Sequence, residues 1–262
     1  MIYEEIKHVL DHQPIKITFY NGFIHHSFDE QEVDLSNSIV RELNGLMTSI
    51  DLSDLVIRPQ SFMFDRDKIY KNNNIISQDI LNHLTSWQDK PFNVTDFIDG
   101  RLLYVGLYHH NIIMTTEHDI NEQVIGYYLT KLKLDLIHHD QLELFKEKIK
   151  GKTLIFRAID SDDVHTIDYQ DDDVFVLVGM IENNTGYDYH FDLELKRMRN
   201  LFNFESPYVY KYMTDKDKVD RLMNTLNEKD LKGIIIHFQM KDGSVLRFKQ
   251  YTNYYKKKRG LS

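Results

Sequence analysis

The sequence has no cysteine, only four prolines and a single tryptophan among its 262 residues. The lack of cysteine excludes disulfides, thiolate catalysis and cysteine-based zinc sites, and it suits a reducing compartment. No apolar run approaches the roughly 20 residues that span a bilayer, and the acidic N-terminal segment contains no signal-peptide core. We therefore expect a cytoplasmic protein without a membrane partner.

The composition is that of an ordered globular protein. Hydrophobic residues make up 42% of the chain and charged residues 28%, with sixteen tyrosines and fifteen phenylalanines, and so many aromatic side chains favour a packed core over disorder. The net charge of −9 argues against non-specific adhesion to nucleic acid over the whole surface. A nucleic-acid site would be a local basic patch, and residues 254–259 form either such a patch or a solvated basic tail.

Hydrophobic spacing predicts a mixture of helices and strands. Helices are expected over residues 2–10, 76–87, 121–134, 139–149, 193–202 and 216–227. Strands are expected over 15–20, 52–57, 93–98, 102–108, 111–116, 153–159, 174–181, 233–239 and 245–249, whereas 38–50 fits either element. Turns are expected at 99–100, 109–111 and 241–243. The irregular order predicts an α+β fold, and the absence of repeats and linkers predicts a single domain over residues 1–262.

Four stretches occur in an order that is informative when they are taken together. They are Phe97-Ile98-Asp99-Gly100, then residues 154–157, then 176–186, and finally 231–235 followed by Arg247-Phe248-Lys249. This order resembles the nucleotidyltransferase core of the phage RNA ligase 1 family, the tRNA-repair ligases, over residues from about 40 to 255. The resemblance implies a ligase-type nucleotidyltransferase fold with mixed or antiparallel sheets and flanking helices. The family's C-terminal helical domain, which helps to recognise tRNA, is not expected here.

Several family positions carry other residue types. Phe97 stands where the family has a lysine, whose amine attacks the α-phosphate of ATP to give a covalent lysine–AMP intermediate. Arg157 and Lys232 stand where the family has two carboxylates that place a divalent metal. Thr115 and Glu117 stand where we would align further basic groups. Phe97, Thr115 and Glu117, together with the retained Asp99 and Gly100, are therefore interpreted as degenerate active-site positions.

The exchanges at positions 97, 157 and 232 make this region more positive than the family pattern. Mg²⁺ binds protein carboxylates beside phosphates, so we expect neither a metal nor a cofactor. Arginine and lysine pair directly with phosphate oxygens, which predicts phosphate or RNA binding by Arg157, Lys232, Arg247 and Lys249. An ion pair from Asp99 to Lys232 or to Arg157, which would close the pocket, is the open alternative.

These differences lead to the prediction of a catalytically inactive, RNA-ligase-like protein that binds RNA, either tRNA or its fragments. No residue is assigned a catalytic role. The resemblance to tRNA-repair ligases implies a phage-encoded inhibitor of host immunity, for example of a CRISPR effector complex. The alternatives are an active ATP-dependent RNA ligase with relocated residues and a protein-only interaction module.

Other motifs carry less weight. The histidine pairs at 25/26, 109/110 and 138/139 lack a metal-binding helix pattern and are expected on the surface or in turns. The acidic residues at 160, 162, 163 and 171–173 are read as solvated loop charge. The tyrosines at 187, 189, 208, 210 and 212 have the chemistry to stack bases, although their alternation favours an amphipathic strand or ordinary packing.

Overall fold

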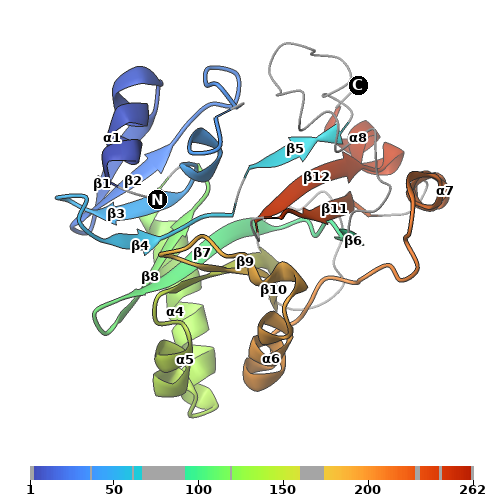
Figure 1. Ribbon diagram of the computed structural model, residues 1–262. Helices are drawn as coiled ribbons and strands as arrows, with labels where there is room; N and C mark the ends of the chain where they lie inside the picture. Colours follow the sequence, from blue (N-terminus) through green and yellow to red (C-terminus); the bar gives the residue numbers. More distant parts are fainter. Residues whose placement is uncertain are drawn as a thin grey trace. The chain divides into compact units, whose positions relative to one another are not determined.

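The computed structural model describes residues 3–35, 37–60, 62–66, 92–118, 120–159, 174–227, 231–241 and 244–260 (Figure 1). The helix predicted over 76–87, the acidic stretches at 160–173 and the turn residues 242–243 lie outside the described residues. The chain forms two compact units: residues 1–60, 101–158 and 175–205 make the first, and 61–100, 159–174 and 206–262 make the second. The described residues contain three four-stranded sheets with helices, which confirms the α+β class. No helix in the described part of the chain is long and apolar enough to cross a membrane.

The first sheet of the first unit follows α1 (Tyr3–His12). Its strands are β1 (Lys16–Tyr20), β2 (Phe23–Ser27), β3 (Leu46–Ser49) and β4 (Leu55–Ile57), which pair antiparallel in that order. The sequence did not predict β2, and the expectation of exposed histidines at 25 and 26 is wrong, because both lie buried on this strand between β1 and β3. The His25 ring hydrogen-bonds the Thr116 carbonyl at 3.0 Å, and His26 Nε2 lies 3.3 Å from Thr48 Oγ1.

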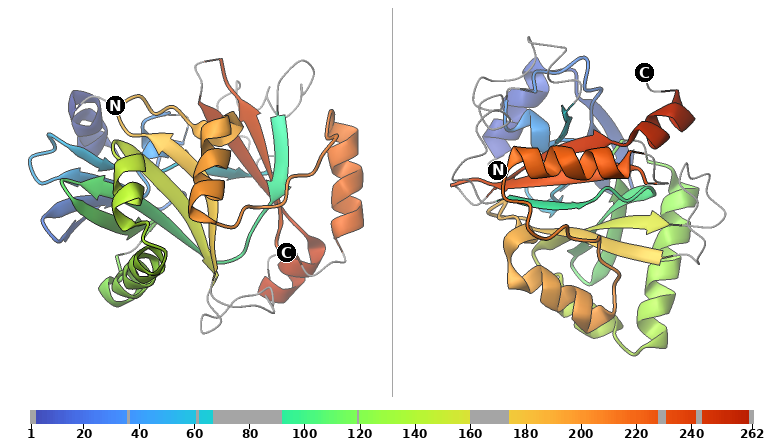
Figure 2. Two further views of the ribbon diagram at one scale, coloured as in Figure 1. Left: turned by 90° about the horizontal axis from the view of Figure 1, so that it is seen from below. Right: turned by 90° about the vertical axis from the view of Figure 1, so that its right-hand side faces the viewer.

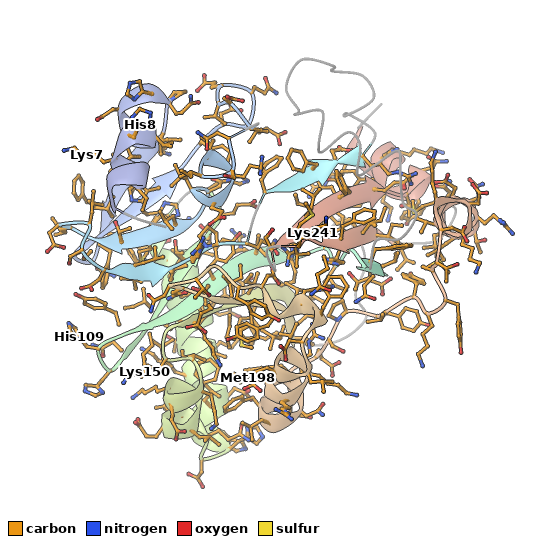
Figure 3. All side chains as sticks on the ribbon, in the orientation of Figure 1. Lys7, His8, His109, Lys150, Met198 and Lys241 are labelled. Atoms are coloured by element: carbon orange, nitrogen blue, oxygen red, sulfur yellow. The ribbon has the colours of Figure 1, made fainter. Side chains whose placement is uncertain are left out.

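The second sheet of the first unit has the order β10-β9-β7-β8. Its strands are β7 (Arg101–Tyr108), β8 (Asn111–Thr116), β9 (Lys152–Ile159) and β10 (Val174–Glu182). Helices α4 (Glu122–His138), α5 (Leu142–Lys148) and α6 (Leu193–Phe202) pack against this sheet, and Met198 of α6 is buried in the shared core (Figure 1). The predicted turn at 109–111 is confirmed, and His109 projects from its tip (Figure 3).

The sheet of the second unit has the order β5-β12-β11-β6. It comprises β5 (Met63–Asp65), β6 (Phe92–Asp96), β11 (Gly233–Gln239) and β12 (Val245–Tyr251), with α7 (Lys216–Leu226) and α8 (Asn253–Arg259) completing the unit (Figure 2). All neighbours are antiparallel except β5 and β12. The basic segment at 254–259 is therefore helical, and its Tyr255 is buried.

The hairpin turn predicted at residues 99–100 is wrong. β6 pairs with β11, whereas β7 pairs with β8 and β9, so the chain passes from one sheet to another at this point. The Phe97 N–H donates to the Gly233 carbonyl at 2.9 Å, which prolongs the pairing with β11 beyond the end of β6. Asp-Gly marks a tight change of direction, but this dipeptide does not reveal which strands become partners.

Candidate functional site

The sheet of the second unit places the relevant side chains by its register. Lys249 of β12 lies opposite Ile235 of β11, and Tyr251 lies opposite Gly233. Side chains two residues apart share one face of a strand, so Lys249 and Tyr251 lie on the same face. A Cβ on Gly233 would be 2.0 Å from the Gln250 carbonyl oxygen. Only glycine permits this approach of the two strands, and Lys232 is thereby fixed at the start of β11.

The Lys232 amine contacts the residue that replaces the family's lysine. Its nitrogen lies 4.3 Å from the centre of the Phe97 ring and donates a 2.9 Å hydrogen bond to Asp99 Oδ1. The Lys232 and Asp99 side chains are only 10% and 6% exposed, and Phe97 is 5% exposed. The ion pair between Asp99 and Lys232, which the sequence left open, is therefore formed. It brings an amine to within a few ångströms of position 97.

Two further aromatic rings complete this arrangement. The Phe97 ring lies 5.4 Å from the Tyr251 ring, and Tyr251 stacks on Tyr255 at 5.3 Å with an interplanar angle of 5°. The Lys232 nitrogen is also 5.3 Å from the Tyr255 ring centre. A cation over an aromatic face is attracted by the ring quadrupole. We use the name Lys232 pocket for this cluster of side chains: Phe97, Asp99, Lys232, Tyr251 and Tyr255.

The sequence did not single out Tyr251, and it placed Tyr255 only within the candidate basic patch at 254–259. The available signals were the two-residue spacing from Lys249 to Tyr251 and the capping residue Thr252, whose hydroxyl accepts from the Tyr255 N–H at 3.1 Å. That cap begins α8 and turns Tyr255 back onto Tyr251. The predicted phosphate contact Lys249 lies at the border of the pocket, with its nitrogen 5.9 Å from the Tyr251 ring centre.

Arg247 lies deeper than a phosphate contact on the surface. It is 1% exposed, and its Nη1 lies 3.4 Å from the Val245 carbonyl oxygen in a long hydrogen bond. It stands opposite His237 of β11, whose Nε2 hydrogen-bonds Thr95 Oγ1 at 2.9 Å. The role of Arg247 in binding phosphate stays a prediction.

Gly100 follows Asp99 in the second unit, and the remaining predicted residues belong to the first unit. Arg157 is half-buried on β9 opposite Leu102. Thr115 is fully buried on β8, and Glu117, just beyond that strand, lies 3.6 Å from the His118 ring nitrogen. Among the predicted positions, the structure brings Phe97, Asp99 and Lys232 into direct contact within the second unit.

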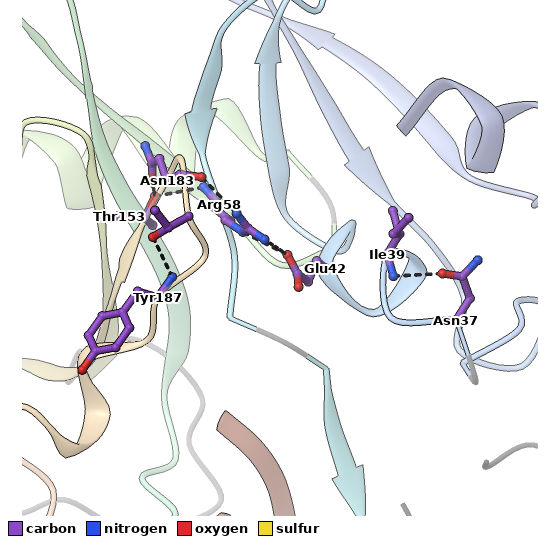
Figure 4. Close-up of polar contacts among 8 residues, drawn as sticks. Asn37, Ile39, Glu42, Arg58, Thr153, Asn183 and Tyr187 are labelled. Atoms are coloured by element: carbon purple, nitrogen blue, oxygen red, sulfur yellow. Dashed lines mark hydrogen bonds and ion pairs between the residues drawn. The ribbon is translucent and has the colours of Figure 1, made fainter. Parts of the chain in front are cut away.

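A polar network of the first unit includes Asn183, in the turn after β10 (Figure 4). Arg58 donates to Glu42 Oε2 from Nε at 2.9 Å and from Nη2 at 2.5 Å, and to the Asn183 carbonyl at 3.1 Å. The Asn183 amide donates to the Val56 carbonyl and accepts from the Thr153 hydroxyl. Each of these bonds ties one segment of the first unit to another. We call Glu42, Arg58, Thr153 and Asn183 the Arg58 network.

The donor set of the Lys232 pocket does not fit a divalent metal. Mg²⁺ requires oxygen ligands, usually one or two carboxylates. The carboxylate of the pocket, Asp99, is hydrogen-bonded to an ammonium, and the second family carboxylate position is Lys232 itself. In the described residues no group of three or more histidines, aspartates or glutamates is placed to hold a metal ion.

Comparisons with known proteins agree with this fold. The sequence model of the RNA ligase family matches residues 45–259. An archaeal ATP-dependent RNA ligase has a similar structure, with a TM-score of 0.65 and 11% identity over 98% of this chain and 63% of the other. A protein from Aquifex aeolicus described as an ATP-dependent DNA ligase gives 0.59 and 12% over 97% and 63%. A mutant Naegleria gruberi RNA ligase with AMP and Mn gives 0.54 and 13% over 82% and 66%.

The chain thus spans about five-eighths of the length of the first solved structures that it matches. At these identities the likeness concerns the fold alone. A comparison with curated protein sequences gave no match.

The prediction that the chain is not an enzyme is wrong on this evidence. The family whose model matches residues 45–259 is that of RNA ligases, and membership of a family of enzymes contradicts the expectation. The prediction relied on Phe97 having no nucleophilic atom, and it did not consider that the lysine at position 232 lies against that ring.

The RNA ligase assignment rests on a match that covers well over half of the sequence and on a nucleotidyltransferase fold shared with ATP-dependent ligases. The chain belongs to the RNA ligase family.

Proposed function

We propose that this chain is an RNA-ligase-type nucleotidyltransferase in which Lys232 supplies the amine that the family has at position 97. One observation supports the proposal: the Lys232 nitrogen lies 4.3 Å from the Phe97 ring centre and 2.9 Å from Asp99. Positions 97 and 232 are neighbours in space. With phenylalanine at the first and lysine at the second, the pocket still contains an amine. This is the relocated-residue alternative that the sequence left open.

The chemistry requires the ammonium to lose a proton before its nitrogen attacks. Asp99 accepts a hydrogen bond from that nitrogen and is the group within reach to take the proton. The nitrogen then forms a bond to the α-phosphorus of ATP, and the bond from this phosphorus to the bridging oxygen breaks, so that pyrophosphate leaves. Phe97 and Tyr255 lie against the amine, Tyr251 packs against both of these rings, and the three side chains limit the approach of water.

We further propose that the substrate is RNA, either tRNA or its fragments. The family's activity on RNA supports this assignment, as does the presence of Lys249 beside the pocket and of lysines on α8. Arg157, Lys232, Arg247 and Lys249 are the proposed phosphate contacts. Substitution of the half-buried contact Lys249 should weaken binding for all RNA sequences and reduce the dependence of affinity on salt.

Transfer of AMP to the protein is a direct test. The protein is incubated with ATP labelled at the α-phosphate and with Mg²⁺ or Mn²⁺, denatured, and examined for covalent label. Wild-type protein and a Lys216→Ala control, which alters an exposed lysine of α7, should both be labelled. Lys232→Arg should not be labelled, because a guanidinium keeps the positive charge beside Asp99 but stays protonated.

The position of the label decides between this proposal and its rivals. Peptide mapping should place AMP on Lys232. A label on another lysine, or full labelling of Lys232→Arg, would show that a different residue is the nucleophile. An unlabelled wild-type protein would overturn nucleotidyl transfer by this chain.

The biological setting is a separate proposal. We infer a phage-encoded protein that acts in the host cytoplasm against an immune complex such as a CRISPR effector, supported by the order of motifs shared with phage tRNA-repair ligases. The net charge of −9 suits docking to a basic protein. Affinity purification from infected cells should recover such a complex in a salt-sensitive manner, and recovery of RNA without any defence protein would contradict this setting.

A further inference from the structure

Residues 206–214 run along the outer edge of the sheet in the second unit. β6 is the last strand of that sheet, and its Asp96 N–H donates to the Tyr208 carbonyl at 3.0 Å. The Tyr210 N–H donates to the Val94 carbonyl at 2.9 Å, and Thr95 forms an antiparallel bridge with Val209. Residues 208–210 are therefore held in an extended conformation by the backbone of β6.

The tyrosines of this segment divide into one anchor and two exposed rings. The Tyr210 hydroxyl donates to Asp96 Oδ1 at 2.5 Å, and the Tyr210 ring meets the Tyr208 ring edge to face at 5.0 Å. Tyr208 is 63% exposed and Tyr212 is 84% exposed. Tyrosines that are fixed by a neighbour and yet open to solvent provide a surface for a ligand rather than part of the core.

Tyr212 has an uncommon backbone conformation, and its side chain is exposed. Its φ is +64°, in the left-handed region, which bulky residues rarely adopt. Glycine or asparagine would suit this position better. A strained tyrosine with its ring in solvent is an observation that ordinary packing does not explain, because the ring packs against little of the protein.

The charge of the segment favours nucleic acid over a basic protein. Residues 206–214 contain no aspartate or glutamate, although the chain carries a net charge of −9. Lys211 lies between the two exposed rings in sequence and is itself exposed. Aromatic rings that stack bases, together with lysines that neutralise phosphates, are the combination by which proteins bind single-stranded nucleic acid.

The segment is also continuous with the Lys232 pocket through a single strand. Asp96, whose backbone and side chain both bind the segment, directly precedes Phe97 of the pocket. We propose that Tyr208, Lys211 and Tyr212 form a stacking platform for unpaired RNA, next to the pocket in the second unit. This inference rests on RNA being the ligand of the chain, as in the proposed function.

The test compares the affinity for a short fluorescein-labelled oligouridine with that for a labelled RNA duplex, by fluorescence anisotropy. The variant combines Tyr208→Ala with Tyr212→Gly, because glycine adopts the left-handed conformation without strain. The platform predicts about tenfold weaker binding of the single strand, with an unchanged or higher Tm and an unchanged affinity for duplex. The matched control is Tyr127→Ala, which removes a 47% exposed tyrosine from α4 of the first unit and should bind both RNAs as the wild type does.

Each other outcome contradicts a stated part of the inference. Equal affinity of variant and wild type for the single strand would overturn the platform and leave RNA binding intact. Equal losses for single strand and duplex would overturn stacking as the basis of binding. A wild type that binds neither RNA would overturn both the platform and RNA as the ligand. AMP labelling of the same preparations reports separately on Lys232, because the platform variant should be labelled at the wild-type rate.

Discussion

The two units each contain a part-buried ion pair, and the two pairs are surrounded in different ways. In the first unit, Arg58 binds Glu42 and the Asn183 carbonyl, and the Arg58 network continues through side-chain and backbone groups (Figure 4). In the second unit, Lys232 binds Asp99 and lies over the rings of Phe97 and Tyr255. Opposite charges are paired in both places, and the first pair also bonds a backbone carbonyl, whereas the second lies against aromatic rings.

This difference separates a structural role from a chemical one. The planar guanidinium has five donors in a fixed geometry and remains charged, so Arg58 is suited to joining segments of the first unit. A lysine amine rotates freely and becomes a nucleophile once it loses a proton. The aromatic faces around Lys232 attract the cation, and its hydrogen bond to Asp99 places the amine beside a carboxylate.

The largest effect on stability is expected at the Arg58 network. Arg58→Ala should lower the free energy of unfolding by about 3–5 kcal/mol, because it strands Glu42 and the Asn183 carbonyl within the protein. It also empties the space next to Gly186, where Arg58 atoms lie 2.4–2.8 Å from the position of a Cβ. Urea denaturation measures the loss, and Arg58→Lys should recover only part of it. A change below about 1 kcal/mol would contradict the role of this network.

The next effect is a dependence of stability on pH that originates at a buried histidine of the first unit. Burial, together with the neighbouring His25, lowers the pKa of His26 from 6.5 to about 4. The unfolded chain therefore takes up a proton first as the pH falls. The stabilisation is fully present above pH 6.5 and is lost between pH 6.5 and 4, with a total of about 3 kcal/mol. His26→Gln should remove this slope, whereas His139→Gln, which alters an exposed histidine, should leave it. A slope that persists in His26→Gln would assign the effect to another group.

A smaller loss is expected at the Lys232 pocket. Lys232→Met and Asp99→Asn should each cost about 2 kcal/mol, because each removes one member of a buried pair. The double variant should cost less than the sum of the single ones, since no charge is then left without its partner. Chemical denaturation of the four proteins gives the coupling energy. Strict additivity would mean that the 2.9 Å contact contributes nothing to stability.

The smallest predicted effects are at matched helix caps. Asn121 caps α4 in the first unit, and Asp215 caps α7 in the second, each by accepting a backbone hydrogen bond. Replacement of either by alanine should cost about 1 kcal/mol. If the units unfold together, both variants shift one thermal transition by a similar amount. Two transitions, each sensitive to one variant, would show that the units unfold independently.

The sequence predicted most elements that have a clear hydrophobic period. The helix at 193–202 and the strand at 233–239 have the predicted bounds, and α1 differs by one or two residues at each end. β2 was missed because Phe23-Ile24-His25-His26-Ser27 does not alternate between apolar and polar residues; it is buried over its whole length. Such strands are determined by their neighbours in the sheet rather than by their own pattern.

The candidate site was predicted in part. The sequence identified Phe97, Asp99 and Lys232 and left open whether the last two pair, which they do. It did not show that the Lys232 amine lies over the Phe97 ring, because 135 positions separate these two residues and only the pairing of β6 with β11 brings them together. The prediction of lost catalysis combined Phe97 with the exchanges at Arg157 and Lys232, but it did not include the contact between Lys232 and Phe97. The contact between the two side chains depends on the pairing of β6 with β11.

The most direct test of the account is the site of AMP attachment. Protein incubated with α-labelled ATP and a divalent cation is denatured and digested, and its peptides are mapped, with Lys232→Arg treated in parallel. The account predicts one labelled peptide containing Lys232 and no label on the arginine variant. Absence of label from the wild type, or label on a lysine elsewhere in the chain, would contradict it.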